Sequence, residues 1–555
     1  MPKVVPGHSD GYNRGHSYRT LDAKMREKIR LLLLPSLADI FFLCPFLILS
    51  LNSGNNLLND LGTGFHIRAG EYIIHNFTIP KYDIFSFIAP PLPWVAHEWL
   101  SEVIMAVVHH ISGPTGVVLF FSFLIAFTYF LLFKFVRASG GNIILSCFIV
   151  FLVAVSSTLH WLARPHIFSL TLLVVCCYIL DAYQYKSKNY LYLLPPITLL
   201  WVNLHGGFVI GFVLLGIYLC GNGAAALFSS APEKSPYQEK FRALTRIALI
   251  CALFAAINPY GVQVFLFPFK TVSQQFLIDT VSEYMSPNFH DSLPFKYLLF
   301  LTLGVLAISR VKTDIIEVSL VLVFTYMALY SARHIPLFAI VVAPILVRHI
   351  ELMLQKSNSK LINLFKSRSK NLDSLDAQLK GYVWPVIVTI VVCILANAAL
   401  IQFTFDKTRA PIGAVSFLEK ESVKGNMFNS DQFGDYVIYA AWPKYKVFVD
   451  GRSDMYGNDR MKEYMKIALV QPGWKEVLAK YDINFIIYNA NSPVSLLLSE
   501  SDNWRLVYAD KTANVFVRNI TANRELINKY PDVNLVGNDS SNPVNLPKSM
   551  LERLS

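Results

Sequence analysis

The sequence predicts a polytopic α-helical membrane protein of about eleven spans, followed by a C-terminal α/β domain. The first indication is composition: 54% of the 555 residues are hydrophobic and only 16% are charged, whereas an ordinary soluble domain carries about 25% charged residues. The second is that the apolar residues gather in runs that can cross a bilayer as helices. The third is a change of character from Asp406 onward, where charges become frequent and apolar runs shorten.

This change of character divides the chain into a membrane part and a later part. No small-residue cleavage site follows the first apolar run, so we expect that run to be an uncleaved anchor rather than a signal peptide. The expected parts are a basic N-terminus (1–30), a transmembrane domain (31–402) with two long outer loops (52–116 and 258–294), an α/β domain (403–519), and a loose tail rich in Asn, Ser and Pro (520–555).

Lys and Arg residues set the orientation of the spans, because cytoplasmic loops carry an excess of them. With the basic N-terminus inside, alternation places five further Lys/Arg clusters on the inner side. We therefore expect a bacterial inner-membrane protein with a cytoplasmic N-terminus and an extracytoplasmic C-terminal domain. The predicted spans are 31–51, 117–136, 143–159, 167–185, 190–203, 206–228, 244–257, 295–309, 315–331, 335–350 and 382–402.

One apolar stretch, residues 98–111, is expected to lie on the outer membrane surface instead of crossing it. Its apolar residues repeat at helical spacing, and Glu98, Glu102 and His109 occupy the opposite face. A helix of this length extends about 21 Å, which is too short for a hydrocarbon core of about 30 Å. Counting it as a span would also move every later loop to the opposite side of the membrane, where the Lys/Arg clusters are not expected.

The C-terminal region alternates strand-like and helix-like segments, which predicts a small α/β domain. The expected strands are 446–449, 483–488, 504–509 and 513–517, and the expected helices are 458–467 and 473–480.

The basic charge and the cysteines do not change this interpretation. The formal net charge is +11, but the sequence carries no zinc-type Cys/His spacing and no nucleic-acid-binding signature, so no nucleic-acid partner is expected. All seven cysteines lie in apolar runs and behave as small hydrophobic residues, so no disulfide framework is implied.

Polar residues gather on the predicted outer side, and the first outer loop is the richest. Asp60 follows the first span directly, where a carboxylate can act as a general base or a metal ligand. The alternative is that Asp60 only caps a helix. The supporting candidates in this loop are His66, Arg68, Glu71, His97 and Glu98.

Later outer loops supply cations and a second carboxylate. Arginine suits bidentate phosphate binding, although an arginine at a membrane interface can also simply reach toward water. Glu283, in the long loop, is the carboxylate that we pair with Asp60. The candidates for binding a donor phosphate are Arg164, His166, Arg333 and His334.

The loop containing Asp60 and the segment His66-Ile67-Arg68 resembles the first outer loop of the GT-C membrane glycosyltransferases. These include oligosaccharyltransferase catalytic subunits, protein O-mannosyltransferases and aminoarabinose transferases. The resemblance implies a GT-C-like fold and a sugar donor linked to polyprenyl phosphate or pyrophosphate at the outer face of the lipid membrane. It also implies that an Asp of this loop, here Asp60, is essential to catalysis.

Two further motifs resemble the oligosaccharyltransferase branch. Residues 280–283 (TVSE) resemble its Thr-Ile-x-Glu motif, whose Glu helps to hold acceptor and metal, which implies a divalent metal (Mg or Mn) on Asp60 and Glu283. Residues 432–436 (QFGDY) resemble its Trp-Trp-Asp-Tyr-Gly acceptor motif and suggest Asp435 as an acceptor residue. Both Trp are missing, and the second outer loop has no Asp-x-Asp, so the acceptor stays open between glycan, lipid and protein.

The segment VFVDGRSDMYGND (447–459) is a further candidate, because acidic groups at the end of a strand often face a site. Asp450, Arg452 and Asp454 are its candidates for covering the membrane site or binding acceptor. The alternative is a polar turn. This segment, with RPHIF, NLHGGF, NPYG and ARHIPLF, also resembles a group of uncharacterised bacterial membrane proteins.

Three functions are compatible with these features. The first is a glycosyltransferase that uses a polyprenyl-linked donor. The second is a non-catalytic GT-C-like scaffold or an assembly factor for lipid-linked glycans. The third is a transporter, which is disfavoured because few ionisable residues fall within the spans and no inverted repeat is evident. Convergence of Asp60 and Glu283 would favour the first over the second.

Overall fold

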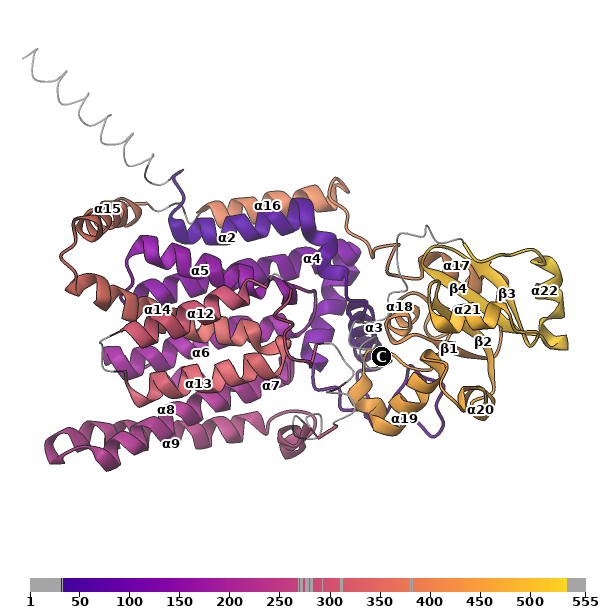
Figure 1. Cartoon of the computed structure of the whole chain (residues 1–555), viewed down its shortest axis with the longest axis horizontal. Coiled ribbons are helices and arrows are strands. Elements are labelled where there is room, and N and C mark those ends of the chain that lie inside the picture. Colours follow the sequence, from indigo (N-terminus) through magenta and orange to yellow (C-terminus); the bar gives the residue numbers. More distant parts are fainter. Residues whose placement is uncertain are drawn as a thin grey trace, which may run out of the picture.

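A helical bundle and a smaller domain attached to one of its ends make up the protein (Figure 1). The computed structural model describes residues 31, 33–267, 269, 273–274, 279, 283–291, 293–309, 313–379, 381 and 383–536, with the backbone alone for 231–233.

A helix lies at each of the eleven predicted spans. The helices are α2 (Leu37–Ile48), α4 (Trp99–Ala138), α5 (Ile143–Ser157), α6 (His166–Lys186), α7 (Leu194–Leu204), α8 (Phe208–Phe228), α9 (Ala231–Ala255), α12 (Phe295–Ile308), α13 (Ile315–Tyr330), α14 (Ile335–Lys356) and α16 (Val383–Asn397). Within the described residues, six segments are long and apolar enough to cross a membrane: Leu37–Leu58, Trp99–Ala138, Ile143–His160, His166–Lys186, Phe208–Phe228 and Ala332–Lys356. Four more apolar helices are shorter, so the chain is a multi-pass membrane protein.

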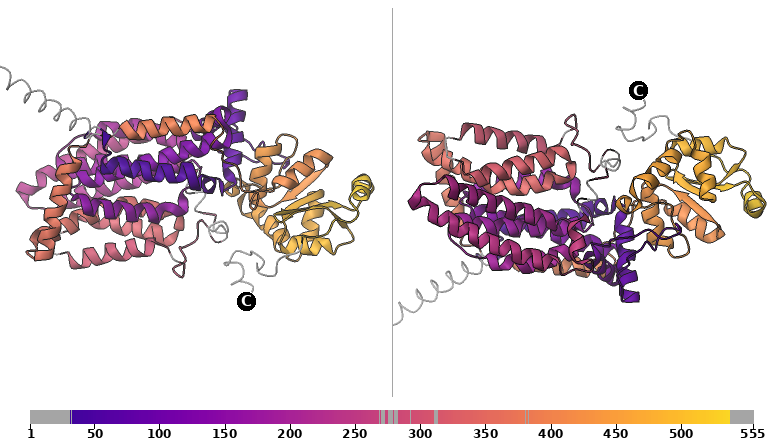
Figure 2. Two further views of the ribbon diagram at one scale, coloured as in Figure 1. Left: turned by 90° about the horizontal axis from the view of Figure 1, so that it is seen from above. Right: turned by 90° about the horizontal axis from the view of Figure 1, so that it is seen from below.

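The predicted outer and inner loops lie at opposite ends of the bundle. Helix α3 (Gly62–Asn76), from the first predicted outer loop, adjoins the C-terminal domain, whereas α15 (Lys360–Asp376), from a predicted inner loop, lies at the far end (Figures 1 and 2). Four of the five later Lys/Arg clusters fall in described segments. The fifth, Arg310 and Lys312, lies outside the described residues.

Helix α4 contains the break expected between the surface helix and the following span. Ser112 and Gly113 have non-helical backbone angles, and Gly113 has a φ of +58°. Pro114 follows, and a proline cannot donate the next helical hydrogen bond. The sequence Ser-Gly-Pro therefore separates the amphipathic segment 98–111 from the apolar remainder of α4.

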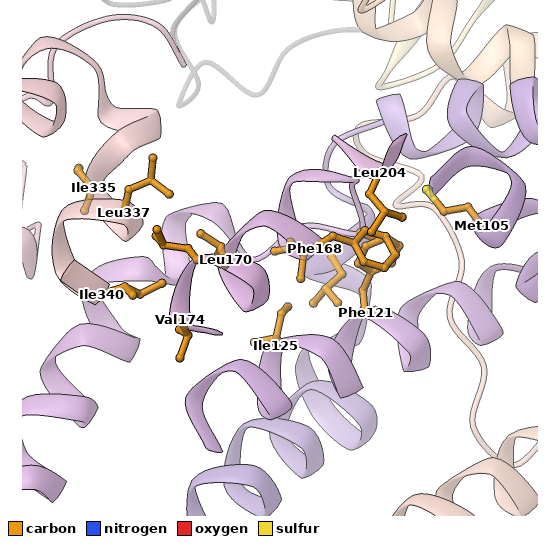
Figure 3. Close-up of a cluster of buried hydrophobic side chains, with 14 of the residues drawn as sticks. Met105, Phe121, Ile125, Phe168, Leu170, Val174, Leu204, Ile335, Leu337 and Ile340 are labelled. Atoms are coloured by element: carbon orange, nitrogen blue, oxygen red, sulfur yellow. The ribbon is translucent and has the colours of Figure 1, made fainter. Parts of the chain in front are cut away.

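Side chains from α4, α6 and α14 form the centre of the bundle (Figure 3). Phe121 and Ile125 of α4 and Val174 of α6 are almost fully buried, as is Ile340 of α14. In a membrane, such close packing stabilises helix association mainly through van der Waals contact.

The C-terminal domain is built on a mixed four-stranded sheet with the order β1-β2-β4-β3. Strand β1 (Asn426–Asn429) is parallel to β2 (Ile483–Asn489), and β4 (Ala513–Arg518) is antiparallel to both β2 and β3 (Trp504–Ala509). Alternate residues of β2 enter different cores, so both faces of the sheet are buried. The helices are α17 (Ile412–Glu421), α18 (Asp431–Ala441), α19 (Ser453–Ala468), α20 (Trp474–Lys480), α21 (Pro493–Ser499) and α22 (Arg524–Lys529).

Two sequence predictions differ from this domain. Residues 446–449 are not a strand of the sheet, because Val447 forms an isolated parallel bridge with Ser86 of the first outer loop. The sheet instead contains β1, whose four residues begin and end with Asn and were not expected to form a strand. Residues 521–529, expected in the loose tail, form a short 3₁₀ turn and α22, and the following Tyr530 contacts Phe417 edge to face. Residues 537–555 lie outside the described part.

Candidate functional site

A shared arginine joins the two carboxylates that the sequence paired. Arg164 Nη1 lies 2.6 Å from Asp60 Oδ2 and 3.4 Å from Glu283 Oε1. The Nε of Arg164 is buried and has no hydrogen-bond partner among the residues that the structure describes. Three residues from separate predicted outer segments therefore converge. The segment that holds Asp60 leads into α3, which adjoins the C-terminal domain (Figure 1).

Further contacts position Asp60 and the loop that carries Glu283. Gly62 N donates to Asp60 Oδ1 over 2.8 Å, so one carboxylate oxygen supports the start of α3 while the other meets Arg164. The loop that carries Glu283 is attached to the turn before α14, because Ser331 Oγ donates to the Glu283 carbonyl. Asp60 therefore contacts the first residue of α3, although the N-cap position itself is occupied by Leu61. Residues 280–282 of the TVSE motif lie outside the described residues.

The charges around Arg164 compensate one another. Burial lowers the pKa of the Arg164 guanidinium, but the nearby carboxylates, Asp60 foremost, more than reverse this and raise it. Burial alone would raise the pKa of the Glu283 carboxyl, whereas Arg164 and Arg333 hold it below its ordinary value. A side-chain cation already lies between the carboxylates expected to hold a divalent metal. In this arrangement that pair does not fit a second cation.

The other expected phosphate-binding residues differ in what they already contact. The Arg333 guanidinium lies 5.2 Å from the centre of the Tyr284 ring and, in the described part of the chain, makes no hydrogen bond or ion pair. His166 Nε2 donates to the His160 carbonyl, and His334 Nδ1 donates to a carbonyl of α13. Arg333 is therefore the arginine of this region whose hydrogen-bonding groups are least used.

The C-terminal domain adds an acidic residue to the same region. Asp435 of α18 is 2% exposed and accepts a hydrogen bond from Gly451 N. Burial, followed by the charges of Asp450 and Asp60, raises the pKa of the Asp435 carboxyl well above its ordinary value. The structure thus brings the sequence-derived acceptor candidate close enough to Asp60 for their charges to interact.

Arg68 and Glu71 attach α18 to α3. Arg68 Nε donates to the Tyr439 carbonyl over 2.6 Å and forms an ion pair with Glu71. A Cβ atom added to Gly64 would lie only 2.7 Å from the Tyr439 Cβ. The close approach of the two helices therefore requires a residue without a side chain at position 64.

Arg452 joins the C-terminal domain to the first outer loop. Its Nη2 donates to Asp450 Oδ2 over 2.6 Å and to Asp83 Oδ1 over 2.8 Å, and all three side chains are buried. The guanidinium lies 4.5 Å from the Trp94 ring centre. Asp450 and Arg452 thus hold the two parts of the molecule together. For the Asp454 side chain, which is in the first turn of α19, the structure gives no polar contact.

A second polar cluster lies beside this centre. His66 Nδ1 donates to Glu102 Oε1 over 3.2 Å, and His66 Nε2 lies 3.8 Å from Glu98 Oε2. On its other side, Glu98 Oε1 lies 3.3 Å from His205 Nε2 and 3.8 Å from His97 Nε2. Ligand atoms of His66, Glu98 and Glu102 all lie within 4.8 Å of one another, so this buried His/Glu group could bind a metal.

Three residues that contact the predicted site residues were not themselves predicted from the sequence. Glu102 follows Glu98 by one helical turn, a spacing that could have paired them. His205 lies in the NLHGGF segment, for which the sequence suggested no role. Asp83 carried no signal, because its importance depends on Arg452, which lies 369 residues further along the chain.

Comparisons with known proteins concern the fold. The sequence matches no protein-family model and no curated protein. The structure is similar to that of the archaeal oligosaccharyltransferase AglB from Archaeoglobus fulgidus in complex with an inhibitory peptide and a dolichol-phosphate. The TM-score is 0.52 at 12% identity, over 81% of this chain and 69% of that chain.

The same organism's oligosaccharyltransferase in the apo form gives a TM-score of 0.51 at 11% identity, over 92% of this chain and 75% of that chain. ArnT from Cupriavidus metallidurans, bound to undecaprenyl phosphate, gives a TM-score of 0.46 at 10% identity, over 86% of this chain and 98% of that chain. The fold is that of the GT-C membrane glycosyltransferases. The GT-C-like fold expected from the resemblance is thereby confirmed.

Proposed function

We propose that this protein is an integral-membrane GT-C-type glycosyltransferase. It transfers a sugar or oligosaccharide from a polyprenyl-phosphate or polyprenyl-pyrophosphate donor to an acceptor on the extracytoplasmic face. The observation that carries this proposal is the convergence of Asp60 and Glu283 on Arg164, at the bundle end that meets the C-terminal domain. The GT-C fold supports it, and the AglB structure of that fold contains a dolichol-phosphate and an inhibitory peptide.

The proposed topology has eleven spans, a cytoplasmic N-terminus and an extracytoplasmic C-terminal domain. It is supported by the basic residues around α15, which lie at the end of the bundle opposite α3 (Figure 1). The membrane is proposed to be a bacterial inner membrane. Donor and site would then meet at the outer leaflet.

The donor phosphate would be bound by Arg333 and Arg164. Among the described residues, Arg333 makes no hydrogen bond or ion pair, although Glu283 lies near enough for their charges to interact, and Arg164 Nε has no hydrogen-bond partner. Two guanidinium groups match phosphate oxygens well and neutralise the charge that develops on the leaving group. His166 and His334 would support this site from the starts of α6 and α14.

Asp60 would act as the base of the transfer. It takes the proton from the acceptor nucleophile while the nucleophile bonds to the anomeric carbon. The bond from that carbon to the phosphate oxygen breaks, and its electron pair leaves on the lipid phosphate. Arg164 holds Asp60 in place through Oδ2, while Asp435 and Glu283 would contact the acceptor. Because Arg164 already lies between Asp60 and Glu283, no metal is needed at this pair.

Binding of a polyprenyl-phosphate sugar tests the proposal. Purified full-length protein in detergent is examined by native mass spectrometry, together with Arg333→Ala and the control Arg242→Ala, an exposed arginine of α9. A hydrogen bond to a charged group contributes about 1.5–3 kcal/mol, so Arg333→Ala should bind roughly 10–150-fold more weakly. If the wild type binds no donor from a panel of lipid-linked sugars, or if both variants bind as it does, the proposal is wrong.

A further inference from the structure

The cluster around His66 contains polar atoms that no side chain satisfies. His66 and Glu102 are each 1% exposed. Within the described part of the chain, the buried atoms His66 Nε2 and Glu102 Oε2 have no hydrogen-bond partner. An unpaired buried polar atom costs about 1–3 kcal/mol, so two in one cluster need an explanation.

The neighbouring hydrogen bonds fix which of these atoms carry protons. His66 Nδ1 faces a carboxylate oxygen of Glu102 at 3.2 Å and therefore donates its proton to it. In the neutral imidazole, Nε2 then presents a lone pair, and it faces another acceptor, Glu98 Oε2, at 3.8 Å.

His205 orients Glu98 from the outside. Gly207 N donates to His205 Nδ1 over 2.9 Å, so the ring proton resides on Nε2. That Nε2 faces Glu98 Oε1 at 3.3 Å and leaves Oε2 directed to His66. An outer group that holds a ligating carboxylate in this way is typical of metal sites.

We propose that His66, Glu98 and Glu102 bind a divalent transition-metal ion, Zn²⁺ or Mn²⁺, through His66 Nε2 and one oxygen of each carboxylate. This site is separate from the Asp60–Arg164–Glu283 centre and does not depend on the proposed transfer reaction. Imidazole with two carboxylates suits these ions better than Mg²⁺, which prefers oxygen ligands alone. One ligand atom of each of the three residues lies within 4.8 Å of the others, and bonds of about 2.0–2.2 Å to a common ion would draw the three side chains closer together.

The position of the site indicates what the metal would do. His66 lies on α3, whereas Glu98 and Glu102 lie at the start of α4. These helices already touch, since a Cβ on Gly70 would lie 1.9 Å from the Glu102 carbonyl oxygen. The ion would fasten α3 to the amphipathic part of α4 and so fix the position of Asp60, six residues before His66.

Metal content of the full-length protein tests this directly. Protein purified without chelator is incubated separately with Zn²⁺, Mn²⁺ and Mg²⁺, desalted, and measured by inductively coupled plasma mass spectrometry. We expect about one Zn²⁺ or Mn²⁺ per chain in the wild type, and a loss of tenfold or more in His66→Gln and Glu102→Gln.

His349→Gln is the matched control. His349 is also 1% exposed and lies 3.1 Å from a carboxylate, Glu317, but its other ring nitrogen is bonded to Ser309 Oγ. It therefore has no free ligand atom, and its replacement should leave the metal content unchanged.

A spectroscopic measurement on the wild type covers the case in which a variant fails to fold. X-ray absorption at the Zn edge should show nitrogen and oxygen neighbours, with an imidazole signature and no sulfur. Wild-type protein that retains no metal after desalting would overturn the proposal, as would sulfur ligation. So would a folded His66→Gln with full metal content.

Discussion

Replacing Arg452 with methionine should weaken the attachment of the C-terminal domain to the first outer loop. The substitution keeps most of the side-chain volume but removes the cation between Asp83 and Asp450. Both carboxylates are almost completely buried, at 1% and 0% exposure of their side chains. Neither could recover its lost partner from water without opening the interface.

The expected magnitude follows from this burial. Removing one partner of a buried ion pair costs about 3–5 kcal/mol, and no discount for solvent screening applies here. At about 2–4 °C per kcal/mol for a folding unit of 150–250 residues, the thermal transition should fall by roughly 6–20 °C. The transition temperature of Arg452→Lys should lie between those of the wild type and Arg452→Met, because a lysine keeps the charge but cannot donate to both carboxylates in the same geometry.

The assay is thermal unfolding of purified full-length protein in detergent, followed by tryptophan fluorescence. Arg518→Met is the control, because Arg518 forms a comparable ion pair with Asp482 that is 42% and 73% exposed. Such an exposed pair contributes about 0–1 kcal/mol. If Arg452→Met and Arg518→Met shift the transition equally, the reasoning from burial fails.

Three further outcomes are expected. Asp60→Asn should lower transfer activity by about 10²–10⁴-fold without weakening donor binding, and an unchanged rate would remove Asp60 from the base role. Gly64→Ala places a Cβ 2.7 Å from a side-chain atom of α18 and should cost about 1–3 kcal/mol in thermal unfolding, whereas Gly304→Ala, which meets open space, should not. Arg452 holds the pKa of Asp83 below its ordinary value of 3.8, although burial alone would raise it. The stability from this pair is therefore present above about pH 4 and is lost as the pH falls through the pKa of Asp83 in the folded protein. The difference in unfolding temperature between wild type and Arg452→Met should then become smaller on acidification. A difference that does not change with pH would contradict this.

The spans could be predicted because a bilayer imposes a length and a composition on each segment separately. A helix occurs at every apolar run of the expected length, and the break before Pro114 follows from its local sequence. Strand pairing is different, because it depends on residues far apart in the chain. Val447 looked like a sheet strand, but its partner is Ser86, and β1 is too short and too polar at its ends to be recognised.

In the candidate site too, the sequence predicted what each segment contributes but not which residues from distant segments meet. Asp60, Arg164 and Glu283 were expected together because all three fall on one predicted side of the membrane, and the structure brings them into contact. Side of the membrane does not specify partners, however. The sequence therefore suggested a metal between Asp60 and Glu283, where the structure has the Arg164 guanidinium.

The core of the C-terminal domain is not made by that domain alone. Three apolar side chains of the first outer loop, Phe87, Ile88 and Leu92, pack into the cluster that also contains Phe448. During synthesis, this loop must wait for most of the polypeptide to emerge before its apolar residues are covered. Insertion of the bundle and folding of the last domain are thus successive stages of a single process. A chain truncated after the last span would leave a hydrophobic surface for chaperones and proteases to recognise.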